Sequence, residues 1–244
     1  MVRKGISRTD IGKVRAKNQD AIFVRDEPFG GLDNLYIVAD GMGGHKAGEI
    51  ASKMAIEAFC EYIEKNHALV KEENLENHLK MGVVFANSQV FSAQRLNPDW
   101  KGMGTTFSAC AFKNNKLFYA HVGDSRIYSF AKKEITPVSH DHTFVAEMLR
   151  FGKITETEAQ IHPHKNILTR ALGTESTILT DAGSFPVSED MKILICSDGL
   201  SNMVSDKEIL EIMNRDTDDG AKADALLALA LENGGKDNIS LIIV

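Results

Sequence analysis

Five aspartates stand beside apolar runs, most of them with glycine as a neighbour: Asp20, Asp40, Asp124, Asp198 and Asp237. Asp40, for example, follows the apolar run 35–39 and precedes Gly41. Glycine allows backbone carbonyls to approach a bound group closely. The pattern therefore predicts a centre built from carboxylates that distant segments of the chain deliver to one place.

Carboxylates next to apolar strands lose solvation and repel one another, so cations are needed to neutralise them. The aspartates have no Cys or His beside them at metal-ligand spacing, and all-oxygen ligands favour Mg²⁺ or Mn²⁺ over Zn²⁺. Two such ions about 3.5–4 Å apart would hold a water, lower its pKa and clamp phosphoryl oxygens. A single Asp-Gly pair is typical of an ordinary turn. The set of five favours a hydrolytic metal site instead.

Short β-rich runs supply most of the elements that would position these aspartates. They lie at residues 21–24, 35–39, 106–112, 117–122, 127–130, 192–196 and 239–244. Groups of strands are followed by groups of helices, and strands and helices do not strictly alternate. This order favours an α+β fold with antiparallel sheets.

Two apolar stripes at helical spacing predict long helices that pack on a sheet. One stripe contains Ile50, Met54, Ala58 and Tyr62, and the other contains Leu75, Leu79, Val83, Ala86 and Val90. Capping boxes at 155–158 and 205–208 predict helix starts, and Gly152 and Gly234 predict helix ends. Residues 140–172 mix short helices, Gly152, Pro163 and histidines, which is typical of a flap over a site.

Composition narrows the class of protein and its partners. The net charge of −6, the pI of about 5.8 and the lack of a basic cluster argue against nucleic acid as a partner. Cys60, Cys110 and Cys196 are widely spaced in apolar surroundings and predict reduced thiols, hence a cytoplasmic location. The longest apolar run, 225–231, is too short for a membrane span.

Seven ordered motifs extend from one end of the sequence to the other. They are Asp10-Ile11-Gly12 with Arg15 and Asn18-Gln19-Asp20; Ala39-Asp40-Gly41-Met42-Gly43-Gly44-His45 with Gly48-Glu49; Gly104-Thr105-Thr106; Val122-Gly123-Asp124-Ser125-Arg126; Thr169-Arg170-Ala171-Leu172-Gly173; Ser197-Asp198-Gly199-Leu200; and Asp237-Asn238. In these motifs the chain resembles the metal-dependent serine/threonine protein phosphatases of type 2C, in their bacterial form. The resemblance implies a single catalytic domain over residues 1–244, folded as a four-layer α-β-β-α sandwich with two central antiparallel sheets and a flap at about 140–172.

The resemblance also implies the ligands of two tightly bound Mn²⁺ or Mg²⁺ ions. Asp40 would bridge the ions, and the Gly41 carbonyl would bind one of them. Asp198 and Asp237 would bind the other ion, and Asp20 would hold a metal-bound water.

Further roles follow from the same resemblance. Asp124, together with Asp198, matches a third and weaker metal site, and Arg15 matches the arginine that binds phosphate. Gln19 stands where many members have Glu, which removes one negative charge near the metals. A histidine that some members place directly after Asp-Gly is absent, because Met42 is there and His45 lies three residues later. The acid for the leaving group therefore has no assigned residue.

The activity implied is hydrolysis of phosphoserine and phosphothreonine in proteins by water held between two metal ions. The partners implied are a cognate serine/threonine kinase and its substrates, met by a monomeric enzyme. Other phosphatase classes fit poorly, since no cysteine has an arginine six residues later and no strand ends in Asp-x-Asp. A phosphate-sensing module without turnover is the remaining alternative, and its expected mark, a lost ligand aspartate, is absent.

Overall fold

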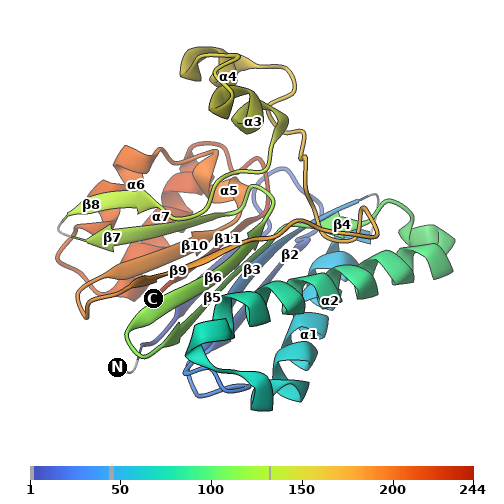
Figure 1. Ribbon diagram of the computed structural model, residues 1–244. Helices are drawn as coiled ribbons and strands as arrows, with labels where there is room; N and C mark the ends of the chain where they lie inside the picture. Colours follow the sequence, from blue (N-terminus) through green and yellow to red (C-terminus); the bar gives the residue numbers. More distant parts are fainter. Residues whose placement is uncertain (1–2, 44–46, 132) are drawn as a thin grey trace.

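Two antiparallel sheets form the centre of the computed structural model, which describes residues 3–43, 47–131 and 133–244 (Figure 1). The first sheet, in spatial order, contains β1 (Ile6–Asp10), β11 (Ile239–Ile243), β10 (Lys192–Cys196), β7 (Arg126–Ala131) and β8 (Glu134–Pro137). The second contains β2 (Asp20–Arg25), β3 (Leu35–Met42), β5 (Phe107–Lys113), β6 (Lys116–Val122) and β9 (Asp181–Pro186), and the short β4 (Gly104–Thr105) pairs with β3.

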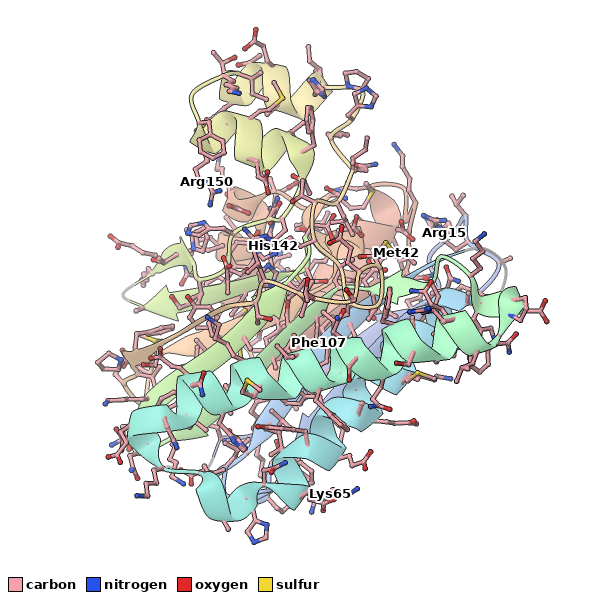
Figure 2. All side chains as sticks on the ribbon, turned by 45° about the vertical axis from the view of Figure 1, so that its right-hand side comes forward. Arg15, Met42, Lys65, Phe107, His142 and Arg150 are labelled. Carbon is pink, nitrogen blue, oxygen red and sulfur yellow. The ribbon has the colours of Figure 1, made fainter. Side chains whose placement is uncertain are left out.

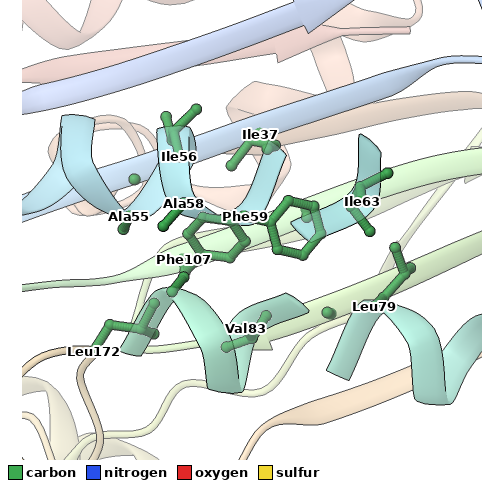
Figure 3. Packing of buried hydrophobic residues seen from close by; sticks show 14 of the residues in the cluster. Ile37, Ala55, Ile56, Ala58, Phe59, Ile63, Leu79, Val83, Phe107 and Leu172 are labelled. Atoms are coloured by element: carbon green, nitrogen blue, oxygen red, sulfur yellow. The ribbon is translucent and has the colours of Figure 1, made fainter. Parts of the chain in front are cut away.

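Apolar side chains alternate between the two faces of these strands, so each sheet buries both faces. Facing side chains such as Val38, Ile195 and Ile242 fill the space between the sheets. The opposite face of the second sheet packs under α1 (Ala47–Lys65) and α2 (Leu75–Leu96), where the rings of Phe59 and Phe107 lie 5.0 Å apart (Figure 3).

The outer face of the first sheet packs under α6 (Asp206–Met213) and α7 (Asp219–Glu232). The four layers are therefore helices, sheet, sheet and helices, and the predicted fold class is confirmed. The short helices η1 (His67–Leu69), η2 (Glu72–Asn74) and η3 (Pro98–Trp100) flank α2, and α5 (Asp198–Ser201) follows β10.

The predicted helix stripes fared differently. Every residue of the stripe on α2 is fully buried, which confirms that prediction. On α1, Ala58 is buried as predicted, but Ile50, Met54 and Tyr62 are only half-buried. The buried face instead carries Ala51, Ala55, Phe59 and Ile63. Ala51 and Ala55 let the first half of α1 approach the sheet closely, whereas Phe59 and Ile63 fill the contact of its second half.

The flap is the insertion that projects at the top of Figure 1, with α3 (Phe144–Arg150) and α4 (Glu156–Ile161). The capping box of Thr155 and Glu158 starts α4 as predicted, and Gly152 follows α3 at a φ of 66°. The two stems of the flap are tied together, since the Thr169 amide donates to the His142 carbonyl over 2.8 Å. Within the described ranges, no helix has both the length and the apolar character that crossing a membrane requires.

Candidate active site

A pocket of about 390 Å³ lies where the ends of the two sheets meet under the flap. Arg15, on the loop after β1, and Met42, at the end of β3, both line the pocket and are labelled in Figure 2. Six of the seven predicted site residues line it: Arg15, Asp40, Gly41, Asp124, Asp198 and Asp237. The seventh, Asp20, lies in the wall behind them and is 7% exposed.

Asp40 is presented by a strand and not by a turn, which corrects the expectation that the strand would end at residue 39. β3 continues through Met42, and Asp40 pairs in register with Asp20 on β2. Gly41 is required there by packing, because a Cβ at this position would lie 2.0 Å from the Gly48 carbonyl oxygen. The rigid sheet therefore fixes two carboxylates side by side.

Asp198 opens the short helix α5. Its Oδ2 accepts a hydrogen bond from Asn202 Nδ2 at 3.0 Å, while its Oδ1 is buried without a partner. Asp20 repeats this arrangement: Ser197 Oγ donates to its Oδ2 over 2.8 Å, and its Oδ1 is also buried and unpartnered. Buried oxygens of this kind are costly unless a ligand satisfies them.

Asp237 and Arg15 face each other across the pocket mouth, with Arg15 Nη2 2.6 Å from Asp237 Oδ2. Asn238 organises both loops. Its Nδ2 donates to the carbonyls of Ile11 and Lys17, and its Oδ1 accepts from the Gln19 amide. These bonds hold the segment that carries Arg15 against the turn that carries Asp237.

Asp124 follows Gly123, whose φ of 109° turns the chain sharply between β6 and β7. The Gly123 amide donates to His142 Nδ1 at 3.0 Å, and the Gly123 carbonyl accepts from the His142 amide at 2.8 Å. His142 is buried at the base of the flap. The flap and the turn that carries Asp124 thus form one connected unit.

Burial and mutual repulsion raise the pKa values of four of the carboxyl groups. Burial raises the pKa of Asp20 and of Asp198 to about 6 each, with neighbouring aspartates adding to it. The pKa of Asp124 rises to about 8, and that of Asp40 lies well above its usual range. Each shift comes first from burial and then from adjacent negative charge, so the site is short of positive charge.

Divalent cations fit this donor set. The carboxylates are all hard oxygen ligands, and the Oδ1 atoms of Asp20 and Asp198 are buried without a hydrogen-bond partner. Among the residues that the structure describes, no three His, Cys, Asp or Glu side chains form a closed ligand cluster. The carboxylates stand instead around the pocket walls, and Arg15 pairs with one of them.

Several residues in or beside the pocket had no role assigned to them from the sequence. Thr106 Oγ1 accepts from the Asp40 amide at 2.9 Å and lies 2.7 Å from Ser125 Oγ, which couples two of the motifs. Asn166 and Leu168 reach the pocket from the flap. Thr106 and Ser125 lie in motifs that the sequence analysis found, whereas nothing in the sequence pattern points to Asn166 and Leu168. His45, the doubtful candidate for a leaving-group acid, lies outside the described residues.

The cysteines offer no alternative nucleophile. All three are free, and burial raises the pKa of Cys60 and of Cys196 to about 12 and that of Cys110 further. Their thiols therefore stay protonated at neutral pH.

Comparison with known proteins identifies the family. The family model described as Protein phosphatase 2C matches residues 13–228. The serine/threonine phosphatase stp of Listeria welshimeri is 38% identical to this chain, over 97% of the chain and 93% of the relative. Among solved structures, the serine/threonine phosphatase of S. agalactiae superposes with a TM-score of 0.91 at 34% identity, covering 98% of each chain.

A structure of the catalytic domain of the serine threonine protein phosphatase PstP, in complex with two manganese ions, superposes with a TM-score of 0.84. It is 34% identical to this chain, over 98% of this chain and 96% of that catalytic-domain chain. This chain therefore belongs to the protein phosphatase 2C family, and it is a hydrolase that acts on phosphorylated proteins. The family and the enzyme class expected from the sequence are confirmed.

Proposed function

We propose that this phosphatase hydrolyses phosphoserine and phosphothreonine in other proteins by direct attack of water, with two Mn²⁺ or Mg²⁺ ions in the pocket. The observation that carries the proposal is the convergence of Asp20, Asp40, Asp198 and Asp237 with Arg15, from opposite ends of the chain, around buried carboxylate oxygens that have no partner. The relatives' names and the manganese complex of PstP support it.

The chain's own residues would hold the ions as the sequence suggests. Asp40 and the Gly41 carbonyl would bind the first ion, and Asp40, Asp198 and Asp237 the second. Asp124 with Asp198 would take a third, weaker ion. When bound, the two principal ions lower the pKa of a water and neutralise phosphoryl oxygens.

Arg15 binds and orients the phosphate in this proposal. Its guanidinium is about half exposed at the pocket mouth and donates to Asp237 Oδ2 over 2.6 Å. A fork of parallel N–H groups matches two phosphoryl oxygens at once, so the group can exchange a carboxylate partner for the substrate. Asp20, fixed by Ser197, orients the water and accepts its hydrogen bond.

The physiological setting is part of the same proposal. The substrates are those of a cognate serine/threonine kinase, and the kinase itself is among them. Three unpaired cysteines favour the cytoplasm. Residues 1–244 act as one catalytic domain and as a monomer, since both sheets and the flap contribute to one pocket within a single chain.

The direct experiment measures turnover of a phosphothreonine peptide and of p-nitrophenyl phosphate with added Mn²⁺ and with EDTA. Asp198→Asn and Asp40→Asn should each lower kcat by at least about a hundredfold, because each removes a proposed ligand of the metals. Asp216→Asn, at an exposed loop position, is the matched control and should leave kcat unchanged. Turnover that persists in EDTA, or that survives both site substitutions, would contradict the mechanism.

A further inference from the structure

A second hollow, of about 720 Å³, adjoins the catalytic pocket. The two share Arg15, Gln19 and Gly43 as a common wall. The rest of its lining comes from the loop after β1, from α1 and from η3 at the end of α2: Ala16, Lys17, Ile50, Asp99 and Trp100. We call it the Trp100 groove. Figure 2 shows Arg15, on the shared wall, near the end of α2 from which η3 continues.

The Trp100 wall of the groove is held firmly. Asn97 Oδ1 caps the turn by accepting from the Asp99 amide at 3.0 Å, and the Trp100 amide donates to the Asn97 carbonyl at 3.0 Å. Gln94 Oε1 accepts from the Gly102 amide at 2.9 Å, which ties the far end of the turn to α2. A recognition surface that is already ordered loses little conformational entropy when a ligand binds.

The groove is apolar at its base, and its rim carries charges of both signs. Trp100 and Ile50 are half-buried and pack against the core under α1 and α2, so each presents part of an apolar side chain to the groove. Lys17 and Asp99 bring one charge of each sign to the rim. The remaining charge, Arg15, is already paired with Asp237. Net charge therefore favours neither an acidic nor a basic ligand.

Because the groove adjoins the catalytic pocket, a substrate bound in that pocket can extend into the groove. A phosphoryl group held by Arg15 places its own residue at the wall that the two hollows share. The residues next to it in an extended substrate advance about 3.3 Å each, so those one to three positions away must pass over a neighbouring surface. One such surface is the flap side, with Asn166 and Leu168, and the other is the Trp100 groove.

We propose that the Trp100 groove binds an apolar side chain of the substrate, within three residues of the phosphorylated Ser or Thr, and that Trp100 is a specificity-determining residue. The inference rests on the proposed function, because it needs a phosphopeptide in the catalytic pocket. It adds a substrate class, phosphosites flanked by aliphatic or aromatic residues on one side.

The test compares phosphothreonine peptides that carry Leu or Ser at each position up to three residues on either side. The wild type should prefer Leu at one position by about tenfold in kcat/KM, the discrimination typical of an apolar pocket. Trp100→Ala should bring that ratio close to one while p-nitrophenyl phosphate, which cannot reach the groove, is hydrolysed as before. Ala16→Gln places a polar side chain in the groove from an exposed loop. It should also bring the Leu-to-Ser ratio close to one, without disturbing the core.

Leu96→Ala is the matched control, since Leu96 is 85% exposed near the same loop and does not line the groove. It should retain the preference. The inference is overturned if no flanking position shows a preference, if the preference survives both groove variants, or if it is for Lys or Arg and disappears in Asp99→Asn.

Fluorescence gives a readout that does not need turnover, because Trp100 is the only tryptophan in the sequence. The preferred Leu peptide should shift Trp100 emission on binding, and the matching Ser peptide at equal saturation should not. Equal responses to the two peptides would contradict the inference. Absence of p-nitrophenyl phosphate hydrolysis by the wild type would instead count against the proposed function, so the two failures are distinguishable.

Discussion

The Asp20→Asn substitution should stabilise the metal-free protein while it impairs the metal-loaded enzyme. Asp20 is 7% exposed, one of its oxygens has no partner, and burial beside Asp198 and Asp237 raises its pKa from 3.8 to about 6. Each pKa unit corresponds to about 1.4 kcal/mol, so ionising Asp20 costs the folded state about 3 kcal/mol. An amide removes that charge and can donate to the neighbouring carboxylates, while its oxygen still accepts from Ser197.

The dependence on pH follows from the sign of the shift. The folded pKa lies above the unfolded value, so the folded protein binds more protons between pH 3.8 and about 6. Stability of the wild type therefore falls as the pH rises through this window and stays lower above it. The advantage of Asp20→Asn should be near zero at the low end and should reach about 3 kcal/mol at about pH 8.

Urea unfolding in EDTA, followed by circular dichroism at several pH values, measures this advantage. Mn²⁺ should reverse the order of the two proteins, because cations stabilise the wild-type carboxylates by binding the native state. Asp216→Asn controls for the loss of a surface charge. A destabilised Asp20→Asn protein in EDTA at about pH 8, or an advantage that is the same at all pH values, would refute this account of the site.

Three further expectations follow. Arg15→Lys should lower kcat/KM for phosphopeptides by about tenfold to a hundredfold, because an ammonium group cannot pair with two phosphoryl oxygens as the guanidinium does; unchanged kinetics would remove Arg15 from phosphate binding. His121 is fully buried, and burial lowers its pKa from 6.5 to about 4, so the folded state binds fewer protons and stability should fall by about 3 kcal/mol as the pH drops through this window. His121→Gln should flatten the pH–stability curve within this window. An unaltered slope would mean that His121 is not the group that titrates there. Leu79→Ala, in the fully buried stripe of α2, should cost about 2–5 kcal/mol in urea unfolding without changing KM; a change in KM would mean that the helix also positions the site.

The sequence predicted the strands that are apolar on both faces and the helix whose large residues are all buried. It missed β1, β8 and β9, whose residues are mostly half-buried or exposed. Strands of this kind are defined by their partners in the sheet, since β1 pairs along its whole length with β11 from the opposite end of the chain. Asp20 was consequently expected at the start of the first strand and lies at the start of the second.

The buried face of α1 was misjudged for a related reason. A search for bulky apolar residues at helical spacing finds Ile50, Met54 and Tyr62. The helix instead packs on the sheet through Ala51, Ala55 and Phe59, and Gly48 meets Gly41 so closely that neither tolerates a Cβ. Local periodicity does not reveal which face a close backbone contact selects.

The sequence alone was enough to predict which residues carry the chemistry, because aspartates beside glycines and apolar strands stand out in seven ordered motifs. How these residues meet follows from the tertiary fold. It placed Asp20 opposite Asp40 by strand register, brought the ends of the chain together through Asn238, and joined the flap to Gly123 through His142. It also placed Trp100 beside Arg15. These contacts join residues far apart in sequence, and their geometry is set by packing of the whole core rather than by local preference.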